Sequence, residues 1–172
     1  MQQNTQVSPE TYLSRIAKAQ QAMKEFGLQA IVLEGGPAMT YFTGVRWGRS
    51  ERTFAVVLPA NGAPAWVAPG FEVMRASELI PAGSDIRAWE EDESPFLKIA
   101  GILKDRGVTS GKVGIEDTVR FFVFNGIRKQ APKLDYVSAE AVLKAAGMDT
   151  MQGPPRRGAT SGAPPAALPA RR

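Results

Sequence analysis

An unbroken apolar run at positions 30–33 constrains the fold more than any other feature of the sequence. It consists of Ala, Ile, Val and Leu, so none of its side chains prefers solvent. Such a run is typical of a strand that helices cover on both faces. A helix pattern comes directly before it, beginning at Pro9 with Ser8 as N-cap and ending at Gly27, which suits a left-handed C-cap. The chain therefore begins as a helix followed by a buried strand of a layered domain.

Strand and helix patterns alternate through the rest of the domain. Residues 53–59 and 63–68 predict a hairpin, because Asn61-Gly62 supplies the positive φ angles of a tight turn. Further strands are predicted at 85–89, 112–116 and 134–137, and further helices at 71–80, 95–107, 119–130 and 139–146. This order predicts a mixed sheet with helices on both faces. The fold class is α/β.

The segment 147–172 differs in composition from the domain expected over residues 8–146. Five prolines fall between positions 153 and 172, and no hydrophobic periodicity continues there. Such a segment buries too little apolar surface to offset the entropy of ordering it, so we expect disorder. Its Pro/Ala/Arg composition is typical of a coding sequence read in a shifted frame. A truncated or frameshifted product is therefore one hypothesis for this chain.

Composition excludes several classes of function. The 172 residues include no cysteine and no histidine, which excludes disulfides, thiolate metal sites and Ser-His or Cys-His catalysis. The formal charge of +4 comes from four arginines after position 152; the other 17 basic residues balance 17 acidic ones. A neutral body lacks the electrostatic footprint of nucleic-acid binding. The basic segment itself could bind an acidic partner non-specifically, with strong salt dependence.

No feature of the sequence predicts a membrane or a cofactor as partner. No apolar stretch approaches the roughly 18 residues that a membrane span needs, and the amino terminus carries no secretory signal. A cytoplasmic location is expected. The Gly35-Gly36-Pro37 segment matches no phosphate-binding pattern and predicts a plain turn. The acidic residues 90–93 are expected to form a solvated loop rather than a cation site.

Two further motifs have structural explanations. Asp117 follows a predicted strand and is a natural N-cap for a helix that begins near Val119. Phe121, Phe122 and Phe124 lie on that helix, and helical spacing predicts that at least two of them pack against the sheet. Neither motif is assigned a catalytic or metal-binding role.

The loop at positions 46–52 is the candidate functional segment. It contains Arg46, Trp47, Arg49 and Arg52 between two apolar segments. Arginine suits bidentate binding of a carboxylate, and Arg and Trp together are common in binding hot spots. An exposed polar loop with one aromatic anchor is the alternative interpretation.

The order of these motifs resembles the amino-terminal domain of the creatinase, prolidase and aminopeptidase P family. The resemblance rests on an amphipathic helix before Leu-Gln-Ala-Ile-Val-Leu (28–33), on Tyr-Phe-Thr-Gly (41–44), on Ser-Glu-Arg (50–52) and on a strand ending in Pro-Ala-Asn-Gly (59–62). Val-Gly-Ile-Glu (113–116) and Tyr-Val-Ser-Ala (136–139) also fit. It covers residues 10–146 and implies a three-layer, ribonuclease-H-like domain with a mixed sheet.

The resemblance also implies where the chemistry of the family resides. In its peptidases, two metal ions are held in a carboxy-terminal catalytic domain by two Asp, one His and two Glu, and they activate water for peptide hydrolysis. This sequence has no histidine, so no catalytic or metal-binding residue carries over. In creatinase-like members the amino-terminal domain lends an arginine to the neighbouring subunit's active site. The matching position here is Arg52, with Arg46 and Trp47 nearby.

The sequence therefore predicts a non-catalytic accessory domain that lacks any cofactor of its own. Such a domain would contribute to a homodimer and to one edge of a substrate pocket that a separate catalytic domain completes. Whether the parent enzyme is a dipeptidase, an aminopeptidase or creatinase stays open, as does the oligomeric state. The alternative is a free-standing binding or regulatory domain that uses the loop at 46–52 for a small carboxylate or a peptide.

Overall fold

The computed structural model describes residues 7–148. The disorder expected for 147–172 concerns residues that, apart from the first two, lie outside this range. Within it, the helices are α1 (Pro9–Phe26), α2 (Pro37–Thr43), α3 (Val73–Leu79), α4 (Pro95–Asp105), α5 (Phe121–Gln130) and α6 (Glu140–Ala145), with a short 3-10 turn, η1 (Gly70–Glu72). The strands are β1 (Leu28–Glu34), β2 (Ala55–Pro59), β3 (Ala65–Pro69), β4 (Asp85–Trp89), β5 (Lys112–Ile115) and β6 (Asp135–Ser138).

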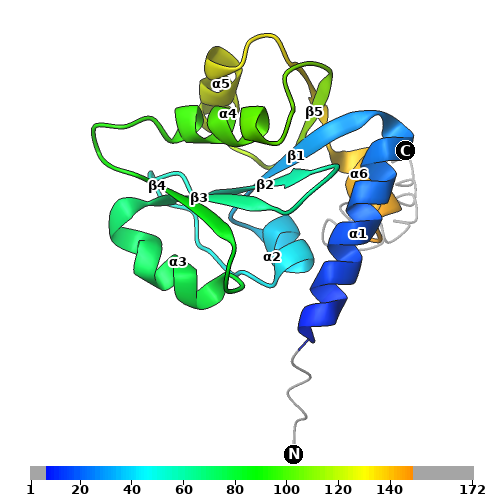
Figure 1. Cartoon of the computed structure of the whole chain (residues 1–172), viewed down its shortest axis with the longest axis horizontal. Helices are drawn as coiled ribbons and strands as arrows, with labels where there is room; N and C mark the ends of the chain where they lie inside the picture. The colour runs from blue at the N-terminus through cyan, green and yellow to red at the C-terminus, as the bar shows by residue number, and fades with distance from the viewer. Residues whose placement is uncertain (1–6, 149–172) are drawn as a thin grey trace, which may run out of the picture.

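The strands of the described residues form one six-stranded mixed sheet in the order β4-β3-β2-β1-β5-β6 (Figure 1). The β1–β2 and β2–β3 pairs are antiparallel, and the β3–β4, β1–β5 and β5–β6 pairs are parallel. The α/β class and the mixed sheet predicted from the sequence are confirmed. Because β1, β5 and β6 run in the same direction, their carboxyl ends meet at one edge of the sheet.

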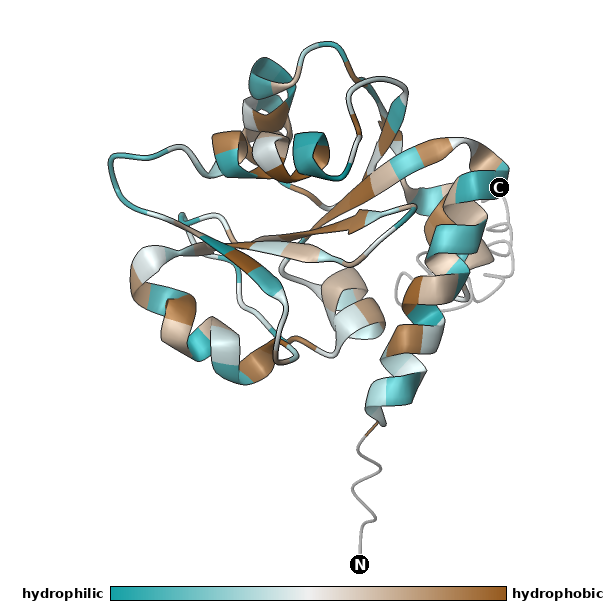
Figure 2. Cartoon of the chain, in the orientation of Figure 1, coloured by the Kyte–Doolittle hydropathy of each residue, from teal (hydrophilic) through white to brown (hydrophobic). Residues whose placement is uncertain are grey.

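Helices cover both faces of the sheet, as the apolar central strand requires. Side chains of β1 alternate between the two faces: Ile31 and Leu33 join one buried cluster, and Ala30 and Val32 join the other. The first cluster lies under α1, α2, α3 and α6, and the second lies under α4 and α5 (Figure 1). Apolar residues recur along the strands of the sheet, whereas brown and teal alternate along the helices (Figure 2). The domain therefore has three layers.

Helix ends largely follow the predicted signals. Ser8 is the N-cap of α1, although its hydroxyl lies 3.1 Å from Thr11 Oγ1 and caps no backbone N–H. Gly27 ends α1 with a φ of 72°, the left-handed conformation that glycine adopts most readily. Ser94 caps α4 by accepting a hydrogen bond from the backbone N–H of Leu97 at 3.3 Å. The turn between β2 and β3 is longer than a two-residue hairpin, and only Gly62 in it has a positive φ.

Helix α5 corrects two predictions. It begins at Phe121 with Arg120 as N-cap, so Asp117 does not cap it; the Asp117 carboxylate accepts a hydrogen bond from Ser138 instead. The phenylalanines do not fill the core either. Phe121 is 74% exposed and Phe122 is 44% exposed, while Val123 and Ile127 of the same helix are buried. Helix α5 therefore packs on the sheet through its aliphatic side, and of the three phenylalanines Phe124 contacts Tyr136 of β6.

Candidate functional site

The loop between α2 and β2 places Arg52 among acidic partners. Arg52 Nε donates to Glu91 Oε1 at 2.8 Å, and its Nη1 donates to Glu51 Oε1 at 2.7 Å. Its guanidinium carbon also lies 5.1 Å from the centroid of the Phe71 ring. The hydrogen bond from Arg52 to Glu91 is the main cause that raises the pKa of the guanidinium. The predicted carboxylate-binding arginine therefore already binds carboxylates of its own chain.

Trp47 anchors the same loop to the domain. Its ring stacks on Phe54 with centroids 3.9 Å apart and an interplanar angle of 10°. The guanidinium carbon of Arg75 lies 4.5 Å from the Trp47 ring centroid on the outside. The backbone at Trp47 passes so close to Gly35 that a Cβ there would lie 2.6 Å from the Trp47 carbonyl oxygen. These contacts fix the aromatic anchor that the sequence suggested.

Arg46 is the loop arginine that is open to a ligand. It is exposed, and within residues 7–148 it makes no hydrogen bond or ion pair with another side chain. The three predicted residues thus lie on one loop but make different contacts. Arg52 is ion-paired, Trp47 is packed, and Arg46 keeps its donors free.

Arg49, already named as part of the loop, is joined at this site by Glu34, which the sequence analysis did not assign to it. Arg49 Nε donates to the Gly35 carbonyl at 2.6 Å, and its Nη2 donates to Thr118 Oγ1 at 2.7 Å. The Glu34 carboxylate, only 2% exposed, lies 3.8 Å from Arg49 Nε. It also accepts hydrogen bonds from the Arg120 guanidinium and from the Arg120 backbone N–H. A glutamate directly after four apolar residues was the one available signal of this buried ion pair.

A hydroxyl continues the network to the next strand. Thr118 Oγ1 accepts from Arg49 and donates to Glu116 Oε2 at 2.6 Å. Glu116 follows β5 and is 8% exposed. The arginine loop is therefore clamped to the carboxyl ends of β1 and β5. In sheets of this kind, ligands bind outside the carboxyl ends of parallel strands.

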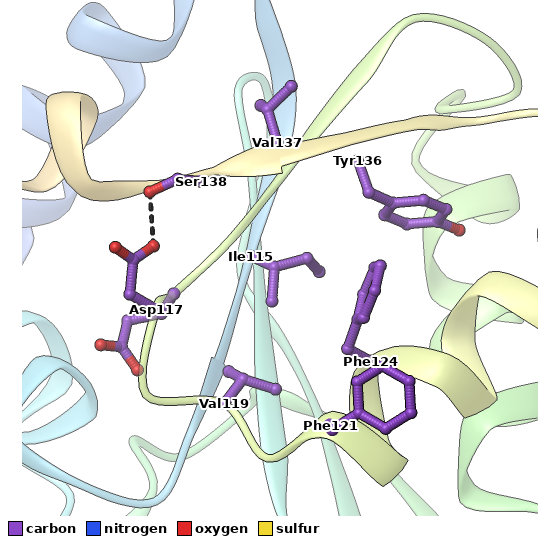
Figure 3. Close-up of a pocket in the computed structure, with 9 residues that line it drawn as sticks. Ile115, Asp117, Val119, Phe121, Phe124, Tyr136, Val137 and Ser138 are labelled. Carbon is purple, nitrogen blue, oxygen red and sulfur yellow. Dashed lines mark hydrogen bonds between the residues drawn. The ribbon is translucent and has the colours of Figure 1, made fainter.

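A cavity of about 360 Å³ opens at the same edge, between β5, β6 and α5 (Figure 3). Its aromatic wall includes Phe124 and Tyr136, whose ring centroids lie 5.7 Å apart. The Tyr136 hydroxyl donates to the Ala131 carbonyl at 2.7 Å. Burial raises the pKa of Tyr136 to about 12, so the phenol is neutral at physiological pH. Asp117 and Ser138 form the opposite, polar end of the cavity.

A larger groove of about 1130 Å³ lies between α1 and the end of α3. Leu13 and Leu79 line it and are 66% and 45% exposed. Three charged residues also line it, Glu78, Asp85 and Arg106, and the last two are paired with each other at 3.3 Å. A hydrogen bond from Arg87 is the main cause that lowers the pKa of Asp85. These pairings leave the groove with a largely apolar surface.

Among residues 7–148, no group of three or more acidic side chains is arranged to hold a metal ion. In the same part of the chain, no helix has both the length and the apolar character that crossing a bilayer requires.

A six-stranded mixed sheet with helices on both faces is the fold that the resemblance in the sequence implied. Residues 15–147 match the family described as the Creatinase/Prolidase N-terminal domain. The chain belongs to this family, as the resemblance in the sequence predicted.

Individual relatives are peptidases. The chain is 29% identical over 136 residues to an uncharacterised peptidase of Schizosaccharomyces pombe, which covers 71% of this chain and 29% of that protein. The crystal structure of dipeptidase PepE from Mycobacterium ulcerans superposes with a TM-score of 0.68 at 27% identity, covering 81% of this chain and 37% of that one. The chain spans less than a third of the length of the curated relatives that it matches.

One structural neighbour consists almost entirely of this fold. The N-terminal domain of Xaa-Pro dipeptidase from Lactobacillus brevis superposes with a TM-score of 0.67, covering 76% of this chain and 98% of that one. At 20% identity, this likeness shows the fold alone.

Proposed function

We propose that this chain acts as the non-catalytic amino-terminal domain of an Xaa-Pro dipeptidase-like enzyme. In that enzyme it contributes to a homodimer, and the loop at 46–52 forms one edge of a substrate pocket completed by a catalytic domain. Membership of the creatinase/prolidase family supports the enzyme class. The absence of histidine from the sequence supports the non-catalytic role, because the metal site implied by the family requires one.

The exposed arginine loop is the main support for a role at the edge of a substrate pocket. Arg49 clamps the loop to the sheet edge, so its backbone is held in place while Arg46 keeps its donors free. Arg52 is fixed at the loop's end by Glu91. A rigid loop that presents guanidinium groups suits a substrate carboxylate, which arginine can bind through two parallel hydrogen bonds.

A chimeric enzyme tests this role. Residues 1–146 replace the amino-terminal domain of Mycobacterium ulcerans PepE, and the hydrolysis of Xaa-Pro dipeptides is measured. A charge-assisted hydrogen bond contributes about 1.5–3 kcal/mol, so Arg46→Ala or Arg52→Ala is expected to raise KM about tenfold or more, with a smaller change in kcat. Lys24→Ala, which removes an exposed cation of α1 outside the loop, serves as the control. Unchanged KM in both loop variants contradicts the pocket-edge role.

The alternative function is a free-standing domain that binds a small carboxylate or a peptide. Arg46 favours it, since an exposed arginine without a partner among the described residues can bind a ligand without help from a second domain. Titration of the purified chain with glycyl-proline, followed by NMR, separates the two. The accessory role predicts no saturable binding. Saturable binding that Arg46→Ala or Arg52→Ala removes supports the free-standing domain instead.

A further inference from the structure

The cavity between β5, β6 and α5 has two chemically different ends (Figure 3). Aromatic rings stand at one end and the Asp117 carboxylate stands at the other, with aliphatic side chains between them. The residues that line the cavity include Ile115, Asp117, Val119, Phe121, Phe124 and Tyr136. A ligand that fits this arrangement has an apolar stem and one charged end.

The charge of that end follows from the carboxylates at the rim. Asp117 is exposed and accepts a hydrogen bond from Ser138, but it forms no ion pair within the described residues. Glu116 beside it reaches Arg49 only through the Thr118 hydroxyl. A carboxylate can accept about four hydrogen bonds, so Asp117 keeps acceptor capacity. The rim is therefore negative and complementary to a cation.

The apolar floor selects the kind of cation. A guanidinium is planar and weakly hydrated, so it loses little on entering apolar surroundings, whereas an ammonium group is strongly hydrated. Its paired N–H donors match a carboxylate. We propose that this cavity binds the arginine side chain of an extended peptide segment from a partner protein. The guanidinium pairs with Asp117, the aliphatic stem lies over Ile115 and Val119, and a neighbouring apolar residue contacts Phe121 and Phe124.

Two observations favour a peptide over a free small molecule. Strand β6 is the last strand of the sheet, and its outer edge pairs with no strand of residues 7–148. Such an edge offers main-chain groups to an extended peptide. Phe121 lines the cavity and is 74% exposed, so the apolar surface of the cavity continues to the outside of the domain. A ligand that uses both features is longer than one side chain.

Titration of the isotope-labelled full chain with two blocked peptides, followed by NMR, tests the proposal. The probes are acetyl-Val-Arg-Val-amide and acetyl-Val-Gln-Val-amide, which differ only in the charged group. The arginine peptide is expected to cause saturable shifts in residues 115–121 and 135–138. The glutamine peptide is expected to bind about tenfold more weakly, since it lacks the charge-assisted pair. Equal affinity for the two peptides would overturn the assignment of a cation site.

Substitutions at exposed positions identify the contacts without disturbing the core. Asp117→Asn is expected to weaken binding of the arginine peptide about tenfold, and Phe121→Ser is expected to weaken its binding about threefold. Asp92→Asn and Phe71→Ser make the same chemical changes at exposed positions outside the cavity, and they are expected to leave affinity unchanged. Affinity that survives Asp117→Asn would contradict the proposal.

The same titration distinguishes other occupants. Free arginine binding as tightly as the peptide would contradict a peptide partner. Shifts confined to the loop at 46–52 would place the peptide on the proposed substrate edge instead and overturn the cavity assignment. Cavity shifts that grow with protein concentration, without peptide, would mean that a second copy occupies it. High affinity that appears only after removal of residues 149–172 would mean that the chain's own basic segment occupies the cavity.

Discussion

Glu34 and Arg120 lie 86 positions apart in the sequence and form an ion pair where β1 ends and α5 begins, with Glu34 buried and the Arg120 side chain 29% exposed. Arg120 Nε donates to Glu34 Oε1 at 2.9 Å, and the Arg120 backbone N–H donates to Oε2 at 3.2 Å. The same carboxylate lies 3.8 Å from Arg49 in the arginine loop. One side chain therefore links the central strand, the start of α5 and the candidate site.

Removal of this carboxylate is expected to destabilise the domain strongly. Breaking a buried ion pair from one side typically costs about 3–5 kcal/mol, and the partial exposure of Arg120 favours the low end of this range, because solvent can hydrate the charge that remains. Glu34→Ala is therefore predicted to lower the free energy of unfolding by about 3 kcal/mol, measured by urea denaturation. Glu25→Ala, at an exposed position of α1, is the control and is expected to change it by less than about 0.5 kcal/mol. Equal free energies of unfolding for the two variants would show that Glu34 does not stabilise the domain.

Two helical glycines are predicted to respond to alanine with opposite signs. A Cβ at Gly126 in α5 would lie 2.3 Å from a ring carbon of Phe96, so Gly126→Ala is expected to destabilise by about 1–3 kcal/mol. A Cβ at Gly101 in α4 would meet only Arg87 Nη1 at 3.6 Å. Gly101→Ala is therefore expected to stabilise by up to about 1 kcal/mol, through helix propensity. The thermal unfolding midpoints of both variants test these two expectations. Stabilisation by Gly126→Ala would contradict the close packing of α4 on α5.

The layered fold was predictable because its strongest signals are local. The apolar run at 30–33, the caps at Gly27 and Ser94 and the alternation of patterns each depend on neighbouring residues. The start of α5 was predicted wrongly for the same reason. Asp117 is a suitable cap by type, but its carboxylate is engaged by Ser138 of β6, a partner that local sequence does not reveal.

The candidate site was only partly predictable. The arginine loop was found from its composition, but the partners that fix it lie far away in sequence. Thr118 is 69 positions from Arg49, and Glu91 is 39 positions from Arg52. The exposure of Phe121 was missed because helical spacing gives the relative positions of side chains, whereas the packing of α5 on the sheet decides which side is buried.

The buried phenol of Tyr136 predicts a stability change at high pH. Its pKa is raised to about 12, above the value near 10 that an unfolded tyrosine has. The neutral form is therefore favoured in the folded state, and its contribution to stability is complete below pH 10 and is lost as pH rises toward 12. The phenolate absorbance is expected to show a late phase near pH 12 that Tyr136→Phe removes. A late phase that persists in this variant would contradict the burial of Tyr136.

Arg52 is predicted to affect binding without affecting stability. Its side chain is 35% exposed, and solvent screens its ion pairs with the exposed Glu51 and Glu91. Arg52→Ala is therefore expected to leave the urea midpoint of the isolated chain unchanged while it raises KM in the chimeric enzyme. Glu91→Gln, which removes a competing carboxylate, is expected to lower KM there. A large fall in the urea midpoint with Arg52→Ala would mean that the arginine is structural instead.

The most direct measurement is an assay of the purified chain against Xaa-Pro dipeptides with added Mn²⁺ or Zn²⁺, beside Mycobacterium ulcerans PepE. No turnover is expected, because the chain has no histidine and residues 7–148 contain no group of acidic side chains arranged to hold a metal. Metal-dependent turnover by the chain itself would contradict the account, since it would require a catalytic centre in a domain assigned only a supporting role.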